Sequence, residues 1–305
     1  MIDLILDPFQ LIDIPLAQWV KSGLRWLVDN YRPVFQSIKM PVTSMLRGFE
    51  WSLKSIPPTA MILGIVLGAW QLAGWRLALG SLFTMIVIGS LGLWTSAMTT
   101  LSIVFTALVI CIVIGIPLGI LAARSSRCDS IMRPILDAMQ TVPAFVYLVP
   151  VVMLFGIGNP SGVLVTIVYA VPPIIRLTNL GIRQVPVDVV EAAFAFGASP
   201  SQVLLKVQIP LAQRTIMAGL NQTLMMALGM SVIASMIAVG GLGQMVLRGI
   251  GRLDMGLATL GGLGIVLLAI LLDRITQAMA PQRRITHQQI WYNRGPVGMV
   301  RRLMR

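Results

Sequence analysis

The chain has 305 residues, of which 56% are hydrophobic and only 11% are charged. Soluble domains carry about 25% charged residues, so this composition excludes an ordinary soluble protein and indicates one that uses lipid as its solvent. The net charge of +12 would suit nucleic acid, but the basic residues lie between apolar segments and form no single patch. We therefore expect a multi-pass membrane protein, embedded in the lipid bilayer and without a nucleic-acid partner.

Residues 1–57 form a separate N-terminal region that holds two amphipathic helical patterns and ends at Pro57. The second pattern is the clearer one, with Val42, Leu46 and Leu53 on a single apolar face. Such a helix either lies in the membrane interface or packs against the rest of the protein. The pattern by itself does not choose between these two placements.

Beyond Pro58 the sequence is a series of apolar runs, each close to the roughly 20 residues that a helix needs to cross a bilayer. We predict seven spans, at 59–75, 77–93, 98–123, 142–158, 161–180, 216–240 and 257–275. The first two runs are separated only near Gly74 and form one bent element in the alternative count of six. The expected fold is all-α, with two accessory helices in 58–97, a five-helix core in 98–280 and a basic cytoplasmic tail in 281–305.

Arginine and lysine residues set the expected orientation, because short loops that are rich in them stay in the cytoplasm. The loops assigned to that side contain Arg76, Arg124, Arg127, Arg133, Arg176, Arg183, Lys206, Arg214, Arg274, Arg283 and Arg284. The loops near Ser96 and Asn159 carry no basic residue and are assigned to the outside. With seven spans, the N-terminus also lies outside.

The loop at 186–210 is too long for a simple connection between two spans, so we expect it to have structure of its own. Its residues predict two short helices, the first ending at Gly197, which suits a left-handed helix terminus. Ser199 and Gln202 are spaced as a capping box for the second helix, and Pro210 is expected to stop that helix.

This loop resembles the signature loop of ATP-binding-cassette (ABC) importer permeases, whose pattern is E-A-A, three residues, G, nine residues, I, one residue, L-P. Glu191, Ala192, Ala193, Gly197 and Pro210 match the pattern identically. Val207 and Ile209 replace its isoleucine and leucine conservatively. The resemblance implies that the loop couples the permease to a separate ATPase dimer in the cytoplasm.

The residue types of the loop suit such a docking element. Ala192, Ala193 and Gly197 are small enough for close approach to a partner. Phe194 and Phe196 are candidate anchors in a groove of that partner, although packing against the protein's own spans is the alternative. Glu191 is a candidate for pairing with a basic group of the ATPase.

A wider resemblance covers residues from about 60 to 280, including the segments around Arg133, Asn179 and Gly243. These segments look like permeases of glycine betaine/proline betaine importers of the ProU type, whose core has the type I ABC-importer fold. The resemblance implies a quaternary-ammonium osmoprotectant as cargo and a periplasmic or surface substrate-binding protein that delivers it. It also implies a permease homodimer in the bacterial inner (plasma) membrane. ATP and magnesium then belong to the partner ATPase, and we expect no cofactor in this chain.

Candidate residues for the translocation path follow from the chemistry of a methylated ammonium, which favours aromatic faces through cation–π attraction. Tyr147 and Tyr169 lie in spans four and five, and Met225 offers a soft surface in span six. Asn221 adds polarity to span six, but hydrogen bonding between helices explains it equally well.

A glycine cluster lies near the outer end of span six. Gly240, Gly241 and Gly243 permit either a break in the helix or close packing, and we take this cluster as a candidate gate hinge.

The energy source is expected to lie outside this chain. The phosphate-binding pattern G-x-x-x-x-G-K-[ST] does not occur, and the single histidine, His287, lies in the tail. No acidic residue lies deep in a predicted span, which disfavours an ion-coupled carrier. An ATP-independent channel or carrier is still the alternative function, with a membrane scaffold as a third. The prediction is a transport subunit that is not itself an enzyme.

Overall fold

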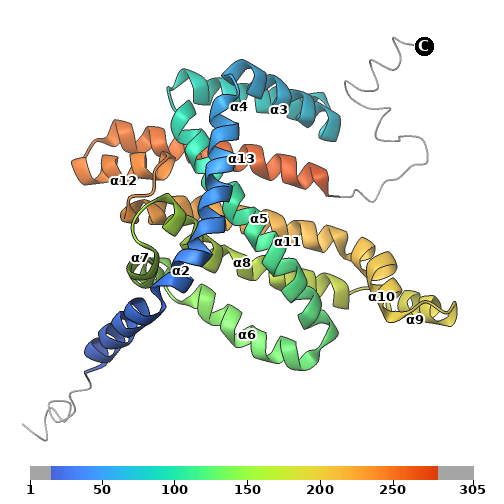
Figure 1. Cartoon of the computed structure of the whole chain (residues 1–305). Coiled ribbons are helices and arrows are strands. Elements are labelled where there is room, and N and C mark those ends of the chain that lie inside the picture. Colours follow the sequence, from blue (N-terminus) through green and yellow to red (C-terminus); the bar gives the residue numbers. More distant parts are fainter. Residues whose placement is uncertain (1–14, 281–305) are drawn as a thin grey trace, which may run out of the picture.

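The computed structural model describes residues 15–280, and in this part of the chain every regular element is a helix (Figure 1). In chain order the main helices are α2 (Leu16–Ser55), α3 (Pro58–Ala73), α4 (Trp75–Ser90), α5 (Trp94–Arg124), α6 (Ser126–Thr141), α7 (Leu148–Phe155), α8 (Asn159–Arg183), α9 (Val187–Ala195), α10 (Pro200–Val203), α11 (Ile209–Ala234), α12 (Leu242–Arg252) and α13 (Met255–Met279). The tail expected at 281–305 lies outside the described residues.

The centre of the molecule is built by α5, α8 and α11, which pack side by side (Figure 1). Small residues allow this close packing, as membrane helices commonly require. Gly119 of α5 is one of them, because a Cβ atom there would collide with Thr178 and with the backbone of Ile175 in α8. The largest buried cluster then joins α5 and α11 to α13 and to the accessory helices α3 and α4.

Four predicted spans correspond to helices that are long and apolar enough to cross a membrane. These are α5, α8, α13 and the continuous helical run Pro200–Ile237 that contains α11. Two bent helix pairs, α2 with α3 and α6 with α7, qualify only if each pair counts as one broken span, which gives six at most. The predicted count of seven is therefore too high for the described residues.

The predicted span 142–158 is the clearest error. Its helical part consists of η2 (Ala144–Tyr147), a 3-10 turn, and the eight-residue α7, which together are too short to cross a bilayer. Pro143 precedes this unit and Gly156, with φ of 81°, ends it. The preceding α6, which the sequence reading treated as loop, meets it at an angle of 99°. The length of an apolar run alone predicted a span here, and it took no account of the proline and glycine that limit the helix.

The N-terminal region also differs from the prediction of two helices, because one helix of 40 residues, α2, runs through both amphipathic patterns. Val42 and Leu46 are buried in a cluster with Ile103 and Val163 of the core, so the second pattern packs on protein. Lys39 adds a polar contact, since its Nζ donates to the carbonyl oxygen of Phe155 at 2.6 Å.

Candidate functional site

The loop at 186–210 projects from one end of the molecule, where α9 and α10 form a tip (Figure 1). Helix α9 has no buried residue. It ends before Gly197, whose φ of 81° is the left-handed conformation predicted for it. The capping box is also confirmed, because the backbone N–H of Gln202 donates to Ser199 Oγ at 3.4 Å and the backbone N–H of Ser199 donates to Gln202 Oε1 at 2.8 Å.

The coupling candidates on this tip face solvent. The side chain of Phe196 is 93% exposed and that of Phe194 is 46% exposed, so packing against the protein's own spans does not account for them. Glu191 and Ala192 are exposed as well, and Ala193 is partly buried. Within residues 15–280, Glu191 has no salt-bridge partner. The tip thus presents an unpaired carboxylate beside two uncovered aromatic rings.

Pro210 does not stop the second helix, contrary to the prediction. It lies in the first turn of α11, and the helical run continues from Pro200 to Ile237. A π-helical turn, η3 (Leu204–Gln208), precedes the proline. Such a turn widens the helix locally, and it lets the chain continue past a residue that lacks a backbone N–H. The loop is therefore joined to the core helix α11 by unbroken helix.

The four path candidates fall into two separate places. Tyr147 and Tyr169 are partly buried against the same cluster, which contains Met230, and the Tyr147 hydroxyl lies 3.2 Å from the carbonyl oxygens of Ala138 and Met139. Asn221 and Met225 line a cavity of about 470 Å³ between α11 and α13.

Asn221 is held by hydrogen bonds to α13. Its Nδ2 donates to Asp273 Oδ1 at 2.8 Å, and its Oδ1 accepts from the Thr276 hydroxyl. Of the two explanations that the sequence left open for Asn221, interhelical hydrogen bonding is therefore observed in the structure.

The glycine cluster forms a tight corner between α11 and α12. Gly241 has φ of 102°, and a Cβ atom there would collide with Thr100 Oγ1 of α5. Hydrogen bonds hold the corner on both sides of Gly241. The Gly240 N–H donates to Asn159 Oδ1 at 2.8 Å, and the Leu242 N–H donates to Thr100 Oγ1 at 2.9 Å. The segment therefore shows both features that the sequence allowed, a break in the helix and close packing.

One polar cluster was not assigned a role from the sequence. Asp129 of α6 is almost fully buried, with 8% of its side chain exposed, and its carboxylate accepts from Arg133 at 2.6 Å and from Asn179 of α8 at 2.7 Å. Arg183 lies 3.6 Å from the same carboxylate and donates to the carbonyl oxygen of Ala122 in α5. Asp129 thus joins α6 to α8, and Arg183 extends the cluster to α5. Its spacing from Asn179 in the sequence gives no signal of this contact.

A second contact joins the same two helices. Arg176 of α8 reaches Asp137 Oδ1 at 2.6 Å and Gln140 Oε1 at 2.8 Å, both on α6. Together with the Asp129 cluster it fixes α6 along α8, at the end of α8 that leads into α9.

A model of the family described as "Binding-protein-dependent transport system inner membrane component" matches residues 115–285. The chain belongs to this family. The match contains the loop at 186–210, the path candidates and the glycine corner. As a family member, the chain is an inner-membrane subunit of a transport system that works with a substrate-binding protein.

Named relatives agree with this assignment. The chain is 61% identical to the glycine betaine/proline betaine transport system permease protein ProW of Escherichia coli (strain K12), over 98% of this chain and 84% of the relative. It is 44% identical to the glycine betaine/carnitine transport permease protein GbuB of Listeria monocytogenes, over 87% of this chain and 95% of the relative.

The fold of this family member is shared with a solved ABC transporter. An inward-facing structure of the MetNI methionine ABC transporter matches with a TM-score of 0.56 and 24% identity, over 62% of this chain and 96% of the solved chain. At that identity the likeness describes the fold alone, and it confirms the predicted type I importer core.

Proposed function

We propose that this chain is the membrane permease of an ATP-driven importer for quaternary-ammonium osmoprotectants such as glycine betaine and proline betaine. The observation that carries the proposal is the 61% identity to a permease named for these two compounds, over nearly the whole chain. The exposed tip with Glu191 and Phe196 supports it, because a permease without its own nucleotide site needs a docking surface for an ATPase.

The proposed coupling follows from the helix that continues through Pro210. A cytoplasmic ATPase dimer binds ATP and magnesium and docks on the tip, where Ala192, Ala193 and Gly197 permit close approach. Because α10 runs without a break into α11, a displacement of the tip moves α11 against α8 and α13. Alternating access would follow from this motion, with ATP hydrolysis in the ATPase and no catalytic step in this chain.

A homodimer of permeases is part of the proposal, since two ATPase subunits present two clefts for two tips. Chemical cross-linking of the purified chain in lipid nanodiscs tests this, with a cross-linked dimer as the expected product.

For the cargo path, Tyr147 and Tyr169 are the stronger candidates, because the polar atoms of Asn221 already have partners in α13. Aromatic rings attract a methylated ammonium without a hydrogen bond. We expect Tyr169→Leu to raise the KM of glycine betaine uptake, whereas Tyr169→Phe, which keeps the ring, leaves it unchanged.

The function is tested by reconstituting the chain in vesicles with its ATPase and substrate-binding protein and measuring uptake of labelled glycine betaine. Uptake should require ATP and should be abolished by Glu191→Arg and by Gly197→Trp, which forces a bulky residue into a left-handed conformation. Gly92→Trp is the matched control, because Gly92 has a φ of 70° and also faces open space, but it lies between α4 and α5, outside the tip. Uptake without ATP would instead favour a channel or ion-coupled carrier.

A further inference from the structure

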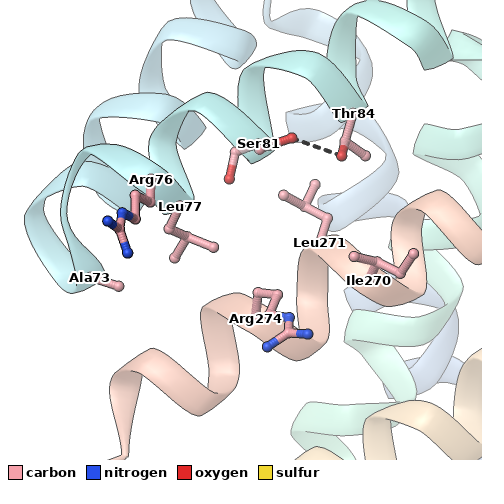
Figure 2. Close-up of a pocket in the computed structure, with 9 residues that line it drawn as sticks. Ala73, Arg76, Leu77, Ser81, Thr84, Ile270, Leu271 and Arg274 are labelled. Carbon is pink, nitrogen blue, oxygen red and sulfur yellow. Dashed lines mark hydrogen bonds between the residues drawn. The ribbon is translucent and has the colours of Figure 1, made fainter.

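A second cavity, of about 430 Å³, lies between α4 and α13, away from the coupling tip and the path candidates. Figure 2 shows Arg76 of α4 and Arg274 of α13 on opposite sides of its opening. The wall between them is mostly apolar and includes Leu77 and Leu271. An apolar cavity with two cationic groups at its mouth has the composition of a site for an amphiphilic anion.

The two arginines have no acidic partner among residues 15–280. The guanidinium of Arg76 lies 5.8 Å from the ring centroid of its neighbour Trp75, and that contact leaves its charge unneutralised. Two like charges at one opening repel each other, and an anion placed between them removes that repulsion.

Ser81 gives an independent indication that the cavity suits a ligand with a hydrogen-bond acceptor. Its side chain lines the cavity and is 1% exposed, and its Oγ has no hydrogen-bond partner in the described part of the chain. A buried hydroxyl without a partner is costly, so such groups in native proteins call for an explanation. The neighbouring Thr84 differs, because its hydroxyl donates to the carbonyl oxygen of Gly80 at 2.8 Å (Figure 2).

The first turn of α4 also faces the cavity, through Arg76 and Leu77. The residue before this helix is Gly74, which offers no side chain to cap the free N–H groups of the turn. These N–H groups carry the positive end of the helix dipole. The positive end of α4 therefore adds to the positive charge of the two arginines near the cavity, and Ser81 adds a hydrogen-bond donor to its wall.

The surroundings indicate a lipid anion. Both arginines were assigned to the cytoplasmic side by the charge distribution, and the C-terminal end of α13 lies on the same side of the molecule as the α9–α10 tip (Figure 1). Leu79 of α4 and Val266 and Ile270 of α13 are exposed apolar side chains on the two helices that form the cavity. They offer a surface for acyl chains next to the charged opening.

We propose that the cavity between α4 and α13 binds the phosphate of an anionic phospholipid of the cytoplasmic leaflet, with phosphatidylglycerol as the simplest example. Arg76 and Arg274 hold the phosphate, and Ser81 donates a hydrogen bond to an oxygen of the headgroup or glycerol backbone. The bound lipid fastens the accessory helix α4 to α13, the last helix of the core.

The test uses the full chain purified in mild detergent with phosphatidylcholine as background lipid. Phosphatidylglycerol is titrated in, and bound lipid per chain is counted by native mass spectrometry. The variant is the double substitution Arg76→Ala with Arg274→Ala. Its matched control is Arg248→Ala with Arg252→Ala, which removes two exposed arginines from α12.

Each arginine near a membrane surface contributes to anionic-lipid binding by an amount that corresponds to about fivefold in affinity. The cavity variant is therefore expected to bind phosphatidylglycerol far more weakly, while the α12 control binds it as the unmodified chain does. A pair of Arg→Lys substitutions should restore most of the binding. Ser81→Ala should weaken binding by a smaller factor, and it serves as the test if the double variant does not fold.

Equal binding by the cavity variant and the unmodified chain would overturn the proposal. So would displacement of phosphatidylglycerol by inorganic phosphate at the same concentration, because the site would then take a free anion. Equal retention of phosphatidylcholine would show that the cavity holds lipid without regard to charge, and it would count against the arginines as the binding groups.

Discussion

Phe196 offers the sharpest quantitative prediction, because its side chain is 93% exposed and yet large and apolar. Burial of such a side chain in a partner's groove contributes about 2 kcal/mol more than burial of alanine. Phe196→Ala should therefore weaken binding of the ATPase by about 30-fold. The substitution should leave the thermal unfolding temperature of the isolated permease unchanged, because the ring packs against little of its own chain.

The assay is equilibrium binding of the purified ATPase to the permease in lipid nanodiscs, measured by biolayer interferometry. Phe83→Ala is the control, since Phe83 is also strongly exposed, at 67%, but lies on α4. ATPase affinity that falls equally in both variants would point to a general effect of losing an aromatic ring. Unchanged affinity in Phe196→Ala would refute Phe196 as an anchor of the docking surface.

Three further predictions concern the interior. Gly241→Val should impair uptake and lower the unfolding temperature, because the added side chain collides with Thr100 and strains a residue with φ of 102°; normal uptake would contradict a role for the corner. Asp129→Ala should cost about 2 kcal/mol of stability, because the buried carboxylate loses its hydrogen bonds to Arg133 and Asn179, whereas Asp137→Ala, at an exposed pair, should cost less than about 1 kcal/mol; equal shifts in thermal unfolding would be inconsistent with this difference. Asn221→Leu should destabilise the purified chain by about 1 kcal/mol through the lost interhelical hydrogen bonds, and an unchanged unfolding curve would argue against that role.

The tip is the part of the candidate site that sequence patterns predicted best. Gly197 and the Ser199–Gln202 capping box depend on neighbours within a few residues, and local backbone preferences alone specify them. The same local rule failed at Pro210. A proline normally ends a helix, but the π-helical turn before it and the packing of α11 on the core keep the helix intact.

The prediction of spans likewise succeeded where local sequence was sufficient and failed where distant contacts mattered. The long runs that became α5, α8 and α13 were recognised because some twenty apolar residues in sequence leave few alternatives in a bilayer. The run 142–158 is also apolar, but Pro143 and Gly156 bound its helical part and leave it too short to span. The preceding segment is the helix α6, which polar contacts of Asp129 and Arg176 hold alongside α8. Those contacts join residues that are far apart in the chain.

The sequence by itself determined that this protein is an all-helical membrane subunit with a docking loop, because composition, apolar run length and a fixed-spacing motif are properties of the linear chain. Only the tertiary structure decided where the helices bend, that Asn221 forms hydrogen bonds with α13, and that Arg76 and Arg274 line one cavity. The reason is physical: residues about 200 positions apart meet only when the whole bundle packs, and no local preference encodes that meeting.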